Sequence, residues 1–315
     1  MKYSIKKIIT LIITLCLVSI FTFTAFQIIP GDSASIALGM NATEKDLLDY
    51  REEMGLNQSI PVRYVTWITN IIQGDFGNSV QYKMPVSKLI SDLMPVTIWL
   101  AVLSFLLILI LSLPLGILAA KKKDGFVDRM ITLVTQVTMA IPPFFMGMII
   151  SLVFGIILKW FTPGKFVNIK DSFPRFILFM IFPAIAVAIP KIAMLVKFLR
   201  SSILRQLNLD YVRTARSKGM KENDILYRHV LKNALIPVIT FMGMMLADIL
   251  AGTILIESVF NLPGLGRTLV VAMSRRDFAV VQTIILYIAT VVVVINFIVD
   301  LLYQWIDPRV SVKSS

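Results

Sequence analysis

Residues 210–237 read DYVRTARSKGMKENDILYRHVLKNALIP, a polar and strongly basic segment between two apolar stretches. Each of these stretches has about 20 mostly apolar residues, which is enough for a helix that crosses a bilayer. Within the segment, the small residues Thr214 and Ala215 are followed by Gly219 and then by an amphipathic stretch. We expect that a segment with these features between two spans binds a partner in the cytoplasm. The identity of that partner would indicate the function.

The composition indicates a membrane protein with several spans. The chain has 315 residues, of which 57% are hydrophobic, and its mean hydropathy is +0.81, whereas soluble domains average about 45–50% apolar residues. The formal net charge of +12 is explained by the gathering of basic residues in cytoplasmic loops. No basic face interleaved with aromatic residues, as in single-strand-binding proteins, is present, so nucleic acid is not an expected partner.

Cysteine and histidine each occur once in the chain. The single cysteine, Cys16, lies in the first apolar run and has neither a disulfide partner nor metal-ligand spacing. The single histidine, His229, excludes a histidine-based metal cluster and a triad built on several histidines. No metal site is predicted.

Six membrane spans are predicted, and the first is a retained anchor. Its apolar core is too long for a signal peptide, and no small-x-small cleavage site follows it. The predicted spans are 8–30, 95–119, 130–158, 175–199, 234–256 and 279–303. They divide the chain into a first anchor (1–30), an extracytoplasmic amphipathic region (31–93), a membrane domain (94–306) with a cytoplasmic loop at 200–233, and a cytoplasmic tail (307–315).

The loop charges predict that both termini lie in the cytoplasm. Segment 200–232 has eight basic and three acidic residues, and segment 121–129 has four basic and two acidic residues. Segment 31–93 has eight acidic and five basic residues, which suits the outer side. The basic residues between 159 and 175 are an exception that a statistical bias allows.

The outer region 31–93 is predicted to form short amphipathic helices on the membrane surface. One runs over 43–54 with Thr43 as its N-cap, and another runs over 61–72 and contains Trp67. The turn-rich sequence GDFGNS at 74–79 follows them.

Proline is frequent inside the predicted spans. Each proline removes a backbone donor and bends a helix, so these residues indicate either bent helices around a path or only the ordinary frequency of proline in membrane helices. The positions are Pro114, Pro142, Pro143, Pro183 and Pro190.

Ionisable residues inside spans are costly and usually functional. Asp248 lies roughly 20 Å from the inner boundary of the fifth span, counted at about 1.5 Å per residue. It either lines a translocation path or forms a pair between helices or subunits, and Lys191 is a second candidate for the path. Glu257 closes the fifth span at its outer side, and Asp300 is expected to pair with Lys197 or Arg200 at the inner boundary.

The motifs of common enzymes are missing. The sequence contains no phosphate-binding GxxxxGK[ST] loop, no GxSxG elbow and no HExxH helix. No catalytic residue is predicted, and uphill transport requires energy from another protein.

The segment 210–237 resembles the cytoplasmic loop of permease subunits of binding-protein-dependent ABC importers. The Glu-Ala-Ala triplet of that loop corresponds to Arg213-Thr214-Ala215, as in the peptide branch, and the glycine four residues later is Gly219. The downstream Ile-x-Leu-Pro corresponds to 229–232, where Lys232 replaces the proline.

The resemblance covers nearly the whole chain and identifies it as a member of the dipeptide/oligopeptide/nickel permease family, first-subunit type. It implies an all-α ABC type I importer permease fold with six transmembrane helices, a cytoplasmic coupling helix and a helical outer region. The matching segments are 30–32, 74–79, 114–116, 141–144, 228–234, 257–266, 276–278, 300–303 and 307–309.

The resemblance also implies partners. These are a second homologous permease that completes a heterodimer, two cytoplasmic ABC ATPases and an extracytoplasmic substrate-binding protein, in the cytoplasmic membrane of a bacterium. No cofactor is expected on this chain, because ATP and Mg would bind the ATPase subunits.

Two groups of site residues follow from the resemblance. A short helix is expected to dock in an ATPase groove through small residues that allow close approach and basic residues that supply charge complementarity, and ATPase closure would move the fourth and fifth spans. The coupling residues are Asp210, Tyr211, Arg213, Thr214, Ala215, Arg216, Lys218 and Gly219. A tight outer turn is a candidate for docking the binding protein, through Asn261, Pro263, Gly264 and Gly266.

The function expected from these features is import of di- or oligopeptides by the assembled complex. Import of nickel or a metal chelate by the same architecture is the alternative, and a stand-alone channel or secondary carrier is a further one. A membrane enzyme would need a cluster of polar groups at one interface, and the sequence has none.

Overall fold

The computed structural model describes residues 2–28, 43–53, 55 and 57–306, and the regular structure among them is entirely helical. The predicted all-α class is therefore confirmed for these residues. The elements are α1 (Lys2–Ile28), α3 (Glu44–Glu53), α4 (Ile60–Ile72), α5 (Val86–Lys121), α6 (Phe126–Met139), α7 (Pro143–Ile150), the π-helix η1 (Ser151–Ile157), α8 (Phe173–Leu207), α9 (Asp210–Ser217), α10 (Glu222–Asp224), the π-helix η2 (Ile225–Val230), α11 (Leu231–Val259), α12 (Leu265–Ser274) and α13 (Phe278–Ile306).

Among the described residues, five helices are long and apolar enough to cross a membrane, and a bent helix pair is a sixth span if the two helices cross as one unit. These spans lie in α1, α5, α8 and α13 and in the continuous stretch that α10, η2 and α11 form. Their outward faces carry large apolar side chains such as Phe21 and Ile110, as lipid contact requires. Pro114, Pro183 and Pro190 lie inside the continuous helices α5 and α8.

The third predicted span, 130–158, is not one straight helix. Helix α6 ends at Met139, α7 begins at Pro143, and the two axes meet at 99°. Pro142 and Pro143 lack N–H donors, and a proline keeps the residue before it out of the helical region. Pro142 accordingly has an extended backbone with ψ 141°, so the chain turns here instead of continuing the helix.

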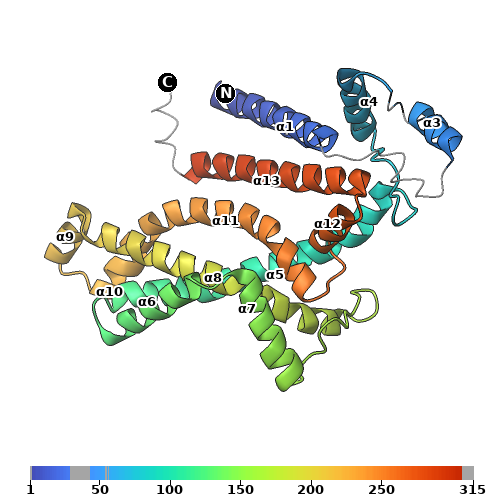
Figure 1. Ribbon diagram of the computed structural model, residues 1–315. Coiled ribbons are helices and arrows are strands. Elements are labelled where there is room, and N and C mark those ends of the chain that lie inside the picture. Colours follow the sequence, from blue (N-terminus) through green and yellow to red (C-terminus); the bar gives the residue numbers. More distant parts are fainter. Residues whose placement is uncertain (1, 29–42, 54, 56, 307–315) are drawn as a thin grey trace.

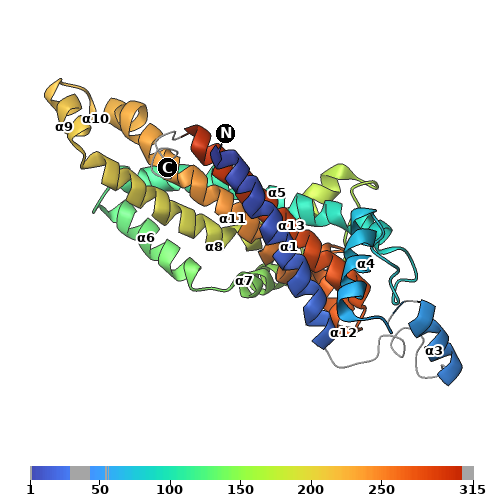
Figure 2. The same cartoon turned by 90° about the horizontal axis from the view of Figure 1, so that it is seen from above.

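Helix α8 is the centre of the bundle and packs against α5, α6, α7 and α11 (Figure 1). It carries fully buried small residues, among them Ala184, Ala186 and Ala188, which let neighbouring helices approach closely. On another side of the bundle, α1 lies along α13 in both views (Figures 1 and 2). A second apolar cluster joins α12 to the first turns of α5 and α13.

Different segments form the two ends of the bundle (Figure 1). The start of α1, the turn between α5 and α6, α9 and the last turns of α13 lie at one end, and α3, α4 and α12 lie toward the other. The basic segments 121–129 and 200–232 thus share one end, as the charge pattern predicts. The predicted tail 307–315 and the family motifs at 30–32 and 307–309 lie outside the described residues.

The two helices predicted between the first two spans are present as α3 and α4. Thr43 caps α3: its hydroxyl donates to Asp46 Oδ2 at 2.6 Å, and the Asp46 N–H donates back to Thr43 Oγ1 at 3.3 Å. The hydrogen bonds from Thr43 lower the pKa of Asp46. Helix α4 packs Tyr64 and Trp67 against Phe23 of α1, with ring centroids 5.5 Å apart in each pair.

Helices α11 and α13 touch at Gly243, which leads to a prediction about stability. A Cβ at this position would lie 2.2 Å from Val299 Cγ2, and a β-branched side chain has little freedom to move away. We expect Gly243→Ala to reduce the stability by about 1–3 kcal/mol, measured as a lower thermal midpoint of the purified chain in detergent.

Gly252 in the same helix is the matched control, because a Cβ there has no other atom within 4 Å. Alanine favours a helix by up to about 1 kcal/mol over glycine, so Gly252→Ala should leave the midpoint unchanged or raise it. Equal midpoints for the two variants would contradict the close approach of α11 and α13.

Candidate functional site

Helix α9 is held to the bundle by one face and exposes the other. Val212 and Ala215 are buried in the main apolar core, whereas Arg213, Thr214 and Arg216 are exposed. The buried and exposed positions follow the helical spacing of three residues. Of the small residues expected to allow close approach, Ala215 therefore contacts this chain itself, and Thr214 lies on the open face.

Part of the charge of α9 is already paired within the segment. Arg216 forms two hydrogen bonds with Glu222, Nε to Oε1 at 2.7 Å and Nη2 to Oε2 at 3.1 Å, and this pairing raises the pKa of Arg216. Arg213 pairs with Asp210 at 3.3 Å, but both side chains are exposed, so this pair contributes little to stability. Tyr211 donates its hydroxyl to Gln206 at the end of α8.

Gly219 ends α9 in a left-handed conformation with φ +75°. Its N–H donates to the Arg216 carbonyl oxygen at 2.9 Å, and the Met220 N–H donates to the Ala215 carbonyl oxygen at 3.3 Å. These two bonds form a Schellman motif, which favours glycine at this position. Lys218 is the exposed C-cap residue directly before it.

The structure brings together the two residues predicted for a translocation path. Lys191 of α8 and Asp248 of α11 form an ion pair, so the interhelical pairing that the sequence left open for Asp248 is present. The Lys191 side chain is 10% exposed, whereas the Asp248 side chain is 66% exposed. Lys191 is therefore the buried member of the pair and Asp248 the exposed one.

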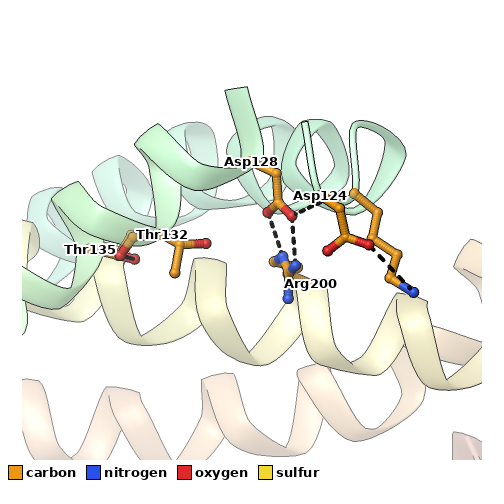
Figure 3. A network of polar contacts seen from close by, with 6 residues as sticks. Asp124, Asp128, Thr132, Thr135 and Arg200 are labelled. Carbon is orange, nitrogen blue, oxygen red and sulfur yellow. Dashed lines mark hydrogen bonds and ion pairs between the residues drawn. The ribbon is translucent and has the colours of Figure 1, made fainter. Parts of the chain in front are cut away.

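The predicted pairing of Asp300 with Lys197 or Arg200 is wrong. Asp300 pairs with Lys7, because α13 packs against α1. Arg200 instead forms two hydrogen bonds of 2.6 Å each with Asp128 of α6 (Figure 3). The Asp124 N–H donates to the same carboxylate at 2.9 Å, so α8 is fastened to the turn after α5 near the end that carries α9.

Two residues of the predicted docking turn lie inside the protein. Gly264 and Gly266 are buried, and a Cβ would lie 2.4 Å from Glu257 Oε2 at Gly264 and 2.3 Å from Ile254 Cα at Gly266. These glycines let the turn close over α11, so any surface for a partner comes from the exposed Asn261 and the half-buried Pro263. Binding-protein docking at this turn stays a prediction.

The turn closes over a buried carboxylate, Glu257, that joins three helices. Thr97 of α5 donates its hydroxyl to Glu257 Oε1 at 2.6 Å, and the N–H groups of Gly266 and Arg267 donate to Oε2 at 2.7 and 3.1 Å. Thr97 Oγ1 also accepts the Leu265 N–H at 3.0 Å. The carboxylate thus satisfies donors at the N-terminus of α12, where negative charge is favourable.

A second buried carboxylate fastens the 74–85 segment to the start of α13. Asp277 Oδ2 accepts the Ser79 hydroxyl at 2.5 Å and the Gln81 N–H at 3.1 Å. Sequence reasoning marked Glu257 as an ionisable group but found neither its partner Thr97 nor the separate contact between Ser79 and Asp277. Only the presence of Ser79 and Asp277 in family-like motifs could have drawn attention to them.

Removing the Glu257 carboxylate should destabilise the fold strongly. Glu257→Ala leaves two backbone N–H groups and a threonine hydroxyl without their acceptor, at a cost of about 1–3 kcal/mol for each buried group. We expect a thermal midpoint well below that of the unchanged chain. Glu257→Gln keeps a carbonyl oxygen for the α12 donors and should lose much less, so an alanine variant as stable as the glutamine variant would contradict this arrangement.

Two family models together match most of the chain. "Binding-protein-dependent transport system inner membrane component" matches residues 112–312, and "Binding-prot-dependent transport system membrane comp, N-term" matches residues 1–101.

Curated relatives match end to end. The chain is 36% identical to a protein from Sinorhizobium fredii named Probable peptide ABC transporter permease protein y4tP, with 98% of each chain covered. It is 37% identical to the Oligopeptide transport system permease protein AppB of Bacillus subtilis, over 98% of this chain and 99% of that one. It is 34% identical to the Glutathione transport system permease protein GsiC of Salmonella typhimurium, over 99% of this chain and 100% of that one.

Proposed function

Because the chain belongs to the family of inner membrane components of binding-protein-dependent transport systems, we propose that it is a permease subunit that imports short peptides. Membership in this family of ABC importer permeases places the chain in a cell membrane and implies ATPase and substrate-binding partners. The observation that carries the peptide assignment is the full-length similarity to relatives named for peptide, oligopeptide and glutathione transport. Glutathione is itself a tripeptide, so the three names describe one chemical class.

The assembly that we propose has a second homologous permease, two ATPases and one extracytoplasmic binding protein. The permease pair forms the path, and hydrolysis of ATP with Mg takes place on the ATPases, so this chain needs neither a cofactor nor a catalytic residue of its own. The absence of a phosphate-binding loop from the sequence supports this division of work.

Helix α9 is the proposed contact with an ATPase. Its exposed face, with Arg213, Thr214 and Lys218, is available to a partner, and its buried face connects it to the core through Val212 and Ala215. Helix α9 follows α8 directly and packs against η2, which continues into α11. A displacement of α9 would therefore pass to the two helices that carry Lys191 and Asp248.

We place α9 and both termini in the cytoplasm. The basic segments 121–129 and 200–232 share one end of the bundle (Figure 1), and an excess of Lys and Arg marks the cytoplasmic side of membrane proteins. The opposite end, with α3, α4, Asn261 and Pro263, would then meet the binding protein outside the membrane.

The orientation can be tested with single cysteines in a Cys16→Ser background, because Cys16 is the one native cysteine. Lys218, the C-cap residue of α9, and Gln81, in the 74–85 segment, are both exposed. In intact cells, a membrane-impermeant thiol reagent should label Gln81→Cys and leave Lys218→Cys unlabelled until the membrane is opened. Labelling of Lys218→Cys from outside would refute the proposed orientation.

Reconstitution tests the function itself. The chain with its partner subunits in proteoliposomes should take up di- and oligopeptides only when ATP and the loaded binding protein are present. Uptake of nickel instead of peptide would favour the alternative function, import of nickel or a metal chelate. Uptake by the chain alone without ATP would refute the proposal.

Gly219→Arg in the same assembly tests the coupling role of α9. It combines backbone strain at φ +75° with a large side chain on the surface that α9 offers to a partner, and we expect at least a tenfold loss of peptide uptake with intact assembly. Gly219→Asn is the control at the same site, because asparagine tolerates the left-handed region, and it should keep most of the uptake.

Gly74→Arg is a strain control, since Gly74 has φ +85° and an equally open environment at the opposite end of the bundle. It should leave the ATPase activity of the assembly without the binding protein unchanged, because Gly74 lies just after α4, far from α9 (Figure 1). Equal uptake by Gly219→Arg and the unchanged chain would contradict the coupling role.

A further inference from the structure

A strip of exposed side chains follows the seam between α8 and α11. On α8 it includes Met194, one turn from Lys191, and on α11 it includes Met244, one turn from Asp248. Leu255 continues it along α11. Residues three and four apart share one face of a helix, so the Lys191–Asp248 ion pair lies within this strip.

The exposure of Asp248 indicates which environment the strip meets. A carboxylate at this depth of a span is costly against lipid and is normally directed to the bundle interior or to a water-filled cavity. The Asp248 side chain is nevertheless 66% exposed on the surface of this chain. The seam therefore faces a polar compartment and not the lipid.

The two members of the pair are suited to different tasks. Lys191 is buried and can neutralise the carboxylate without being reached from the strip. Asp248 presents open carboxylate surface that a second cation can approach. The flanking Met194 and Met244 side chains are flexible and polarizable, which suits contact with side chains of varied shape.

We propose that Asp248 is a substrate contact in the translocation path, where the exposed part of its carboxylate receives the ammonium group of a passing peptide while Lys191 stays paired with it. This inference rests on the proposed function and adds a specific recognition residue to it. The substrate ammonium binds beside the Lys191 ammonium, so neither the carboxylate nor the buried lysine is left unpaired when the peptide leaves. Binding that is favourable and yet easily reversed is what passage through a membrane requires.

The test uses the complete reconstituted transporter and a peptide with a free amino terminus. Asp248→Asn should reduce the peptide uptake rate about tenfold, since a neutral amide binds an ammonium group more weakly than a carboxylate does. Asp248→Glu keeps the carboxylate and should retain at least half of the uptake rate. The uptake rate is expressed per amount of assembled complex, which is measured for every variant.

The double variant Lys191→Gln/Asp248→Asn separates recognition from a structural role. If the pair only holds α8 to α11, removal of both charges relieves the unpaired buried lysine and should restore uptake. If Asp248 binds the substrate, uptake in the double variant should stay as low as in Asp248→Asn. Restored uptake in the double variant would overturn the proposal.

Asp300→Asn is the matched control, because it breaks another aspartate–lysine pair between two spans, away from the seam. It should keep the uptake rate of the unchanged transporter, and an equal loss in Asp300→Asn and Asp248→Asn would overturn the assignment.

Unchanged uptake in Asp248→Asn would refute this inference alone. A failure of the unchanged transporter to import peptides would instead refute the proposed function.

Discussion

The structure depends on one constraint, which is that a backbone inside a bilayer finds no water to satisfy its N–H and C=O groups. Helices satisfy these groups within the segment, so the apolar stretches of this chain become α1, α5, α8, α11 and α13. Where two consecutive donors are missing, at Pro142-Pro143, the helix stops and the chain turns by 99°. Single prolines inside α5 and α8 do not have this effect, because neighbouring turns and helices accommodate the loss of one donor.

The same scarcity of water determines where polar side chains are placed. Two buried carboxylates near the ends of the bundle are well supplied with donors: Glu257 by Thr97 and the start of α12, and Asp128 by Arg200 and the Asp124 N–H. Such fully satisfied groups fasten helices that are distant in the sequence. The Lys191–Asp248 pair is different, because one of its members stays open at the surface of the chain. Two fastened ends with an exposed charge between them suit a subunit whose middle meets a changing partner.

The proposed coupling helix, α9, combines attachment and exposure on only eight residues. Val212 and Ala215 bind it to the core, the Schellman motif at Gly219 ends it, and the Arg216–Glu222 pair ties its end to the turn that leads into α11. A rigid attachment of this kind transmits displacement, whereas a flexible loop would absorb it. This is the physical reason to regard α9 as a receiver of motion from a partner and not as a solvated basic loop.

Much of this protein follows from local sequence. Runs of apolar residues define the spans, Thr43 and Asp46 define the start of α3, and the spacing of Thr214, Ala215 and Gly219 marks α9, because helix formation, capping and chain termination depend on neighbouring residues. The sequence also marked Asp248, Lys191 and Glu257 as unusual, since charge inside a span is costly wherever its partner lies. The sequence could not show which residues meet, because such contacts depend on the order of helices around α8 and α13. Asp300 pairs with Lys7, Arg200 pairs with Asp128, and Glu257 accepts a hydrogen bond from Thr97. The burial of Gly264 and Gly266 and the open side of Asp248 were likewise decided by tertiary packing, which alone determines what lies against each face of a helix.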